Sequence, residues 1–122
     1  MAQELFRNSE RRRDPRIGAR FEVGFNHASD AAKAFKAFSV NFSAGGLCLK
    51  SSRPHAVGDV VQLSLDVENE HFELKGSIQW ARAGVIGVRF LDVTAPDRER
   101  LQSVARALIG RGAPIETEPG TP

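Results

Sequence analysis

The sequence predicts an all-β domain: a six-stranded antiparallel barrel with one C-terminal helix and a flexible basic arm at the N-terminus. Short runs of alternating apolar and polar residues follow one another between residues 21 and 90, and this period of two is typical of strands with one buried face. Turn residues separate the runs at hairpin spacing, which gives about six strands. From residue 94 the apolar period lengthens to that of a helix. Closing the sheet into a barrel removes its exposed edges.

Length and composition limit the chain to one domain. Its 122 residues, 41% hydrophobic and 26% charged, can form a single core. We expect residues 1–19 to form the arm, residues 20–111 the barrel with its helix, and residues 112–122 a disordered tail rich in Pro, Gly, Thr and Glu. No stretch resembles a signal peptide or a membrane span. The protein should therefore be cytoplasmic, without membrane insertion.

The first half of the predicted barrel contains three runs with apolar residues at every second position. These residues are Phe21, Val23 and Phe25, then Phe38, Val40 and Phe42, and then Leu47 and Leu49. Each set should face the core, and residues 43–46 should form the turn before the third run. Cys48 is the only cysteine, so no intramolecular disulfide can form, and we interpret it as a small strand residue.

The second half predicts a hairpin and a final strand. The apolar face consists of Val61, Leu63, Leu65 and Val67, then Phe72, Leu74, Ile78 and Trp80, and then Ile86, Val88 and Phe90. Residues 68–70 and 83–84 offer the turns between these runs. Gly76 interrupts the second apolar face, where we expect a bulge.

The last predicted element is a helix. Thr94 and Asp97 resemble a capping arrangement around Pro96, because a threonine hydroxyl can accept a free amide and an acid favours the positive helix end. The apolar stripe that follows can lie across a barrel mouth, and it consists of Leu101, Val104, Ala105 and Leu108. Gly110 and Gly112 should end the helix.

Catalytic and metal signatures are missing from the sequence. The three histidines, at positions 27, 55 and 71, lie in or beside predicted loops with no cysteine or carboxylate spaced to complete a metal site. The chain has no G-x-S-x-G elbow, no P-loop and no G-x-G-x-x-G after a strand. We therefore expect neither an enzyme nor a metal or other cofactor.

Basic residues are concentrated in one segment. Residues 7–20 contain six arginines and two acids, a local charge of +4 in a chain of net charge +2. Such a segment is most often a solvated tail or a nonspecific phosphate binder. A guanidinium group, however, matches both a phosphate and the O6/N7 edge of guanine in a bidentate way. Pro15 keeps the segment extended, so that Arg12 and Arg16 can project toward a ligand.

A polar turn between two strands complements the arm. The pattern N-x-S-x-G-G is typical of a turn between two strands and needs no ligand to explain it. Asn41 nevertheless offers an amide that can contact a base edge, and Ser43 offers a hydroxyl and backbone amides suited to a phosphate. Gly46 allows close approach of a backbone.

Together these segments resemble the PilZ domain over roughly residues 10–109. The resemblance rests on Arg12-x-x-x-Arg16 preceded by Glu10-Arg11, on Asn41-x-Ser43-x-x-Gly46, on a strand ending at Trp80, and on the stretch from Gly87 to Phe90. PilZ domains are bacterial receptors for the second messenger cyclic di-GMP. The resemblance implies that Arg12 and Arg16 contact guanine and phosphate, while Asn41, Ser43 and Gly46 hold the ligand from the barrel.

Three positions refine what the resemblance implies. Asn41 stands where many members have Asp, so one negative charge is missing while an acceptor for guanine N–H groups remains. Arg11 resembles members that bind an intercalated pair of ligands, which implies two cyclic di-GMP molecules per chain. Trp80 has two interpretations: a core residue, from its parity with Ile78, or a residue that lies against a bound guanine, as in some relatives.

The expected function is that of a signalling adaptor. Cyclic di-GMP would order the arm and so present a new surface to an unidentified downstream effector protein, in motility, exopolysaccharide or pilus machinery. One alternative is a small barrel that binds nucleic acid, which the predicted inward phenylalanines and the absence of tyrosine disfavour. The other is a PilZ-like interaction protein that binds no nucleotide, which the intact motif positions disfavour.

Overall fold

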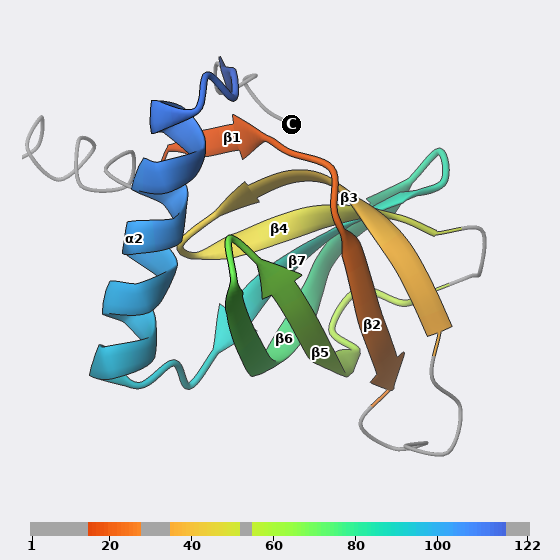
Figure 1. The fold of residues 1–122 in the computed structure, drawn as a ribbon. Coiled ribbons are helices and arrows are strands. Elements are labelled where there is room, and N and C mark those ends of the chain that lie inside the picture. The colour runs from red at the N-terminus through yellow and green to blue at the C-terminus, as the bar shows by residue number, and fades with distance from the viewer. Residues whose placement is uncertain (1–14, 28–34, 52–54, 117–122) are drawn as a thin grey trace, which may run out of the picture.

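Six antiparallel strands form a closed barrel in the computed structural model, which describes residues 15–27, 35–51 and 55–116 (Figure 1). The described residues form eight strands in all, and the barrel consists of β2 to β7. The strands are β1 (Arg16–Gly18), β2 (Glu22–His27), β3 (Phe35–Ser43), β4 (Gly46–Lys50), β5 (Val60–Val67), β6 (Glu70–Arg82), β7 (Val85–Leu91) and β8 (Ile115–Glu116), and the helix is α2 (Ala95–Gly110). The sheet order is β2-β5-β6-β7-β4-β3-β1-β8, and a further pairing of β2 with β3 closes strands β2 to β7 on themselves. The predicted six-stranded barrel with a C-terminal helix is confirmed.

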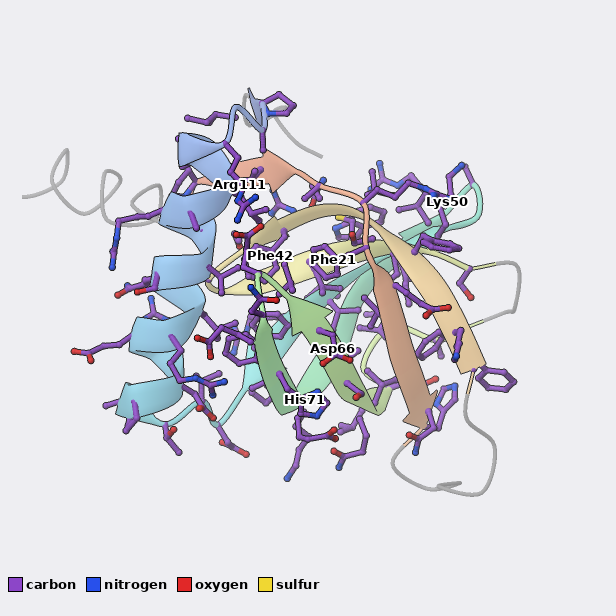
Figure 2. All side chains as sticks on the ribbon, in the orientation of Figure 1. Phe21, Phe42, Lys50, Asp66, His71 and Arg111 are labelled. Atoms are coloured by element: carbon purple, nitrogen blue, oxygen red, sulfur yellow. The ribbon has the colours of Figure 1, made fainter. Side chains whose placement is uncertain are left out.

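The inward face of the barrel is mostly the one that the alternation predicts. Val23, Phe25 and the apolar residues predicted for β5, β6 and β7 are buried, apart from Trp80. Phe21 is half-buried and meets Phe42 edge to face, with ring centroids 5.8 Å apart (Figure 2). Consistent burial of one face in successive strands is what fixes their register, because a slip of one residue would turn each core side chain outward.

Strand β1 corrects the expected end of the arm. Ile17 is fully buried and pairs with Phe42, although residues 1–19 were expected to be flexible. Ile115 pairs with Ile17 in turn, so the first part of the expected disordered tail is the short strand β8. Single apolar residues in polar segments give no periodic signal, which is why the sequence did not reveal these strands. The rest of the predicted arm and tail lies outside the described residues.

Strand β3 departs from the predicted alternation. Ser39 lies opposite Leu49 and Asn41 lies opposite Cys48, so Val40 is an extra residue in a β-bulge. As a result Phe38 and Val40 are 40% and 36% exposed, not buried as expected. The buried Ser39 hydroxyl is satisfied because it donates to the Ala19 carbonyl at 2.6 Å and accepts from the Phe21 amide at 2.9 Å.

The bulge expected at Gly76 is three residues away, at Gln79. Gly76 pairs regularly with Phe90, whereas Ile78 lies opposite Val88 and Trp80 lies opposite Gly87. Gly76 has a packing role instead, since a Cβ atom there would come within 2.4 Å of Val88 Cγ1 inside the barrel.

Helix α2 begins and ends where the sequence predicts. The Thr94 hydroxyl accepts from the Asp97 amide at 3.3 Å, and the buried face consists of Leu101, Val104 and Ala105. Arg100 fixes the helix to β6: its Nε and Nη2 donate to Glu70 Oε1 at 3.0 and 2.9 Å. None of the described helical residues forms a stretch long and apolar enough to span a membrane.

Leu101→Ala should lower the free energy of unfolding by about 2–5 kcal/mol, because it leaves a cavity under the helix where a side chain is fully buried. Urea denaturation followed by circular dichroism measures this. The exposed Glu99 provides the control, and Glu99→Ala should change stability by less than about 0.5 kcal/mol. Equal effects of the two changes would contradict the packing of α2 on the barrel.

The β5–β6 hairpin should contribute a pH-dependent stability. His71 Nδ1 lies 2.8 Å from Asp66 Oδ1, and Nε2 lies 2.6 Å from Glu73 Oε2 (Figure 2). These hydrogen bonds to Asp66 and Glu73 raise the pKa of His71 above 6.5. The stabilisation is therefore complete below pH 6.5 and is lost as the pH rises through the folded-state pKa. NMR titration should show the raised pKa, and Glu73→Gln should lower it; an unchanged value would contradict the contact.

Candidate functional site

A row of residues in register crosses the outer face of the barrel. Asn41 of β3 lies opposite Cys48 of β4, Cys48 lies opposite Gly87 of β7, and Gly87 lies opposite Trp80 of β6. The neighbours of these residues on β4 and β7 are core residues, so this row faces away from the core. We call it the Asn41–Trp80 row.

A second row lies beside the first on the same face. Ser43 is opposite Gly46, Gly46 is opposite Arg89, and Arg89 is opposite Ser77. We call it the Ser43–Ser77 row. The two rows bring the predicted turn motif and the predicted strand end of Trp80 to one continuous surface, although about forty residues separate them in the chain.

The bulge at Gln79 places Trp80 on this surface. An uninterrupted strand would turn Trp80 inward with Ile78, but the extra residue exchanges the two faces. Trp80 is consequently half-buried on the outer face, and the core interpretation of this residue is wrong. A Cβ atom at Gly87 would come within 2.3 Å of Trp80 Nε1, so the indole lies directly on the Gly87 backbone. The Arg82 guanidinium carbon lies 5.2 Å from the indole centroid.

Arg16 reaches the other end of the Asn41–Trp80 row. Its Nη1 donates to Asn41 Oδ1 at 3.2 Å and to Cys48 Sγ at 3.6 Å. Strand β1 positions it, because Ile17 is anchored in the core and its neighbour must then point outward. Arg16 is half-buried and Asn41 is 8% exposed, so the guanidinium covers the amide.

The turn between β3 and β4 is held by its own serine. Ser43 Oγ accepts from the Gly45 amide at 3.2 Å and donates to the Gly46 carbonyl at 3.3 Å. Gly46 is required by close packing: a Cβ atom there would come within 2.2 Å of the Val88 carbonyl oxygen. The turn is therefore a rigid edge of the surface, as expected from its residue types.

Five of the seven predicted site residues thus share one surface: Arg16, Asn41, Ser43, Gly46 and Trp80. Arg11 and Arg12 lie outside the described residues. The sequence interpretation missed Gly87, which seats the indole, and Arg89, which stands beside Gly46. The alternation of Arg89 with the core residues Val88 and Phe90 could have placed its side chain on the outer face.

The surface combines a guanidinium group, an amide, a hydroxyl and a half-buried indole ring. An anionic group suits the guanidinium, while a flat heterocycle suits the indole and can hydrogen-bond the amide. No group of three or more His, Cys, Asp or Glu residues in the described part of the chain could hold a metal ion. Together, these groups suit an anion that carries an aromatic ring.

Gly87→Ala should displace the indole of Trp80, because the added methyl group occupies its place. Trp80 is the only tryptophan, so its fluorescence reports the change directly. We expect red-shifted emission and stronger quenching by acrylamide. Gly110→Ala is the control, since nothing lies within 4 Å of a Cβ atom there. Unchanged emission of the Gly87 variant would contradict the seating of the indole.

Several solved structures share this fold. The PilZ domain of CeSA from a cellulose-synthesizing bacterium has a TM-score of 0.61 at 22% identity, and the match covers 79% of this chain and 96% of that one. The PilZ domain of YcgR from Escherichia coli, solved with c-di-GMP, has a TM-score of 0.68 at 18% identity and coverages of 83% and 93%.

The Bacillus subtilis inhibitor of motility, MotI/DgrA, has a TM-score of 0.70 at 15% identity; the match covers 83% of this chain but only 52% of that one. At these identities the likeness shows the fold alone. No curated protein matches the chain. The sequence profile of the PilZ domain, however, matches residues 10–107, most of the chain. The chain belongs to the PilZ domain family.

Proposed function

We propose that this protein binds cyclic di-GMP on the surface formed by the Asn41–Trp80 row and the Ser43–Ser77 row. The observation that carries the proposal is the contact between Arg16 and Asn41, at 3.2 Å. It joins the two halves of the sequence motif, which are separated by 25 positions in the chain. Membership of a family of cyclic di-GMP receptors supports the same ligand.

Each group of the surface has a function toward this ligand. Arg16 supplies a charge-assisted, bidentate donor for a phosphate or for the O6/N7 edge of guanine. The Asn41 amide accepts from guanine N–H groups, and the Ser43 hydroxyl turns from the Gly46 carbonyl to donate to a phosphate oxygen. Trp80 offers an aromatic face on which a guanine stacks.

The contact between Arg16 and Asn41 also preorganises the site for its ligand. In the structure Arg16 already bonds Asn41, so the guanidinium is oriented before any ligand arrives. Ligand binding then costs less side-chain conformational entropy than it would with a freely rotating arginine. Arg12 lies on the part of the arm outside the described residues, and it supplies the second guanidinium of the motif.

The downstream function is that of an adaptor. Ligand contacts with Arg11 and Arg12 order the arm, and the ordered arm presents a new surface to an effector protein in the cytoplasm. No catalytic step is part of this proposal. The extra arginine at position 11 extends the site to a second ligand molecule, which gives two molecules of cyclic di-GMP per chain.

A nucleic-acid-binding barrel remains the second candidate because of one observation. Phe38 is exposed on the outer face, and the Arg20 guanidinium carbon lies 4.0 Å from its ring centroid. The expectation that the phenylalanines face inward is wrong at this position, and an exposed aromatic beside a cation suits a stacked base. Calorimetry with cyclic di-GMP and with single-stranded RNA at two salt concentrations separates the candidates, since polymer binding falls steeply with salt.

Arg16→Ala should weaken the binding of cyclic di-GMP at least tenfold, because one hydrogen bond from a charged group contributes about 1.5–3 kcal/mol. Isothermal titration calorimetry measures the affinity, and thermal unfolding checks that the barrel is intact. Arg106→Ala serves as the matched control, since Arg106 is an exposed arginine on α2 whose side chain hydrogen-bonds only Ser103 among the described residues. An Arg16 variant that binds like the wild type would exclude the proposed site.

Arg11→Leu should reduce the calorimetric stoichiometry from two ligands per chain to one. The first ligand keeps Arg12, Arg16 and the barrel surface, whereas the second loses its guanidinium partner. Titration of the wild-type protein in parallel sets the reference. A stoichiometry of two that persists in the variant would contradict the assignment of Arg11.

A further inference from the structure

Arg89 faces the proposed site from the side opposite Arg16. It lies opposite Gly46 in the pairing of β4 with β7, and Gly46 lies opposite Ser43. The pairing of Ile17 with Phe42, continued by one residue, places Arg16 level with Ser43. The Ser43–Ser77 row therefore has one arginine on β1 and another on β7, with Ser43 and Gly46 between them.

The spacing of the two arginines suits a compact dianion. Neighbouring strands lie ~4.8 Å apart, so three strand spacings separate the two backbones by roughly 14 Å. Gly46 has no side chain to stand between them, and no larger residue fits there because the Val88 carbonyl lies against it. Two long side chains can extend over this low position from opposite sides and hold a ligand that lies on the Ser43 turn.

The Arg89 side chain has no structural interaction in the part of the chain that the structure describes. Its side chain is exposed and forms no hydrogen bond, ion pair or ring contact with any of the described residues. Arg82 and Arg100 differ in this respect, because the first stacks on Trp80 and the second joins α2 to Glu70.

We propose that Arg89 is a binding residue of this site and contacts a phosphodiester group of the cyclic dinucleotide. The proposal rests on the proposed function. Cyclic di-GMP carries two phosphodiester groups, each with one negative charge. Arg16 reaches the ligand from β1 and Arg89 reaches it from β7, so that the barrel alone supplies cations on two sides of the ring.

Substitutions of Arg89 test the proposal by calorimetry with cyclic di-GMP. Arg89→Gln should weaken binding about tenfold or more, since a hydrogen bond from a charged donor to a charged acceptor is lost. Its affinity should also depend less on salt than that of the wild type, because one fewer cation meets a phosphate. Arg89→Lys should retain most of the affinity, because a phosphate accepts a point charge whereas a guanine edge requires the planar fork.

The controls separate the possible failures. Arg106→Gln removes an exposed arginine from α2 and should bind like the wild type. Thermal unfolding should show that Arg89→Gln is folded, as expected for an exposed side chain without partners. Wild-type affinity of Arg89→Gln would overturn the inference alone, and a lysine variant as weak as the glutamine variant would overturn the phosphate assignment. A wild-type protein that does not bind cyclic di-GMP would instead overturn the proposed function.

Discussion

The two β-bulges, at Val40 and Gln79, are the constraint on which the surface of this barrel depends. In a closed barrel without bulges, strict alternation would decide the direction of each side chain from that of its neighbours. One extra residue in β3 lets both Ser39 and Phe42 face inward while Asn41 faces outward. One extra residue in β6 turns Trp80 outward after the core residue Ile78. The same two irregularities therefore complete the core and assemble the outer row of polar and aromatic groups.

Glycines make the close packing behind this surface possible. Gly46 lets β4 approach the Val88 carbonyl, and Gly87 provides the seat of the indole. A methyl group at either position would come within 2.3 Å of a neighbouring atom, so something would have to shift. Both positions lie in strands, where glycine is otherwise unfavourable. These two glycines therefore allow close packing within the same two rows that contain Ser43 and Asn41.

Strand β1 fixes Arg16 to the barrel. Ile17 is buried against β3 and Ser39 binds the backbone of the segment from Ala19 to Phe21, so the chain is fixed to the barrel from Arg16 onward. Arg16 consequently belongs to the fixed platform together with Asn41, although the sequence placed it on the flexible arm. Arg11 and Arg12 precede β1 and lie outside the described residues. The proposed cyclic di-GMP site therefore combines residues fixed on the barrel with residues that precede β1.

The sequence by itself determined the six strands, the hairpin turns, the capped helix and the residue types of the motif, because these depend on short-range periodicity and local turn chemistry. The alternation around the core residue Phe42 already puts its neighbours Asn41 and Ser43 on the opposite face of β3. Only the tertiary structure decided the exposure of Phe38, the outward turn of Trp80 and the pairing of Ile17 with β3. Each bulge is set by the register in which β3 pairs with β4 or β6 pairs with β7, and an isolated apolar residue such as Ile17 is buried only where another strand pairs with its own. Neither event leaves a periodic signal in the chain itself.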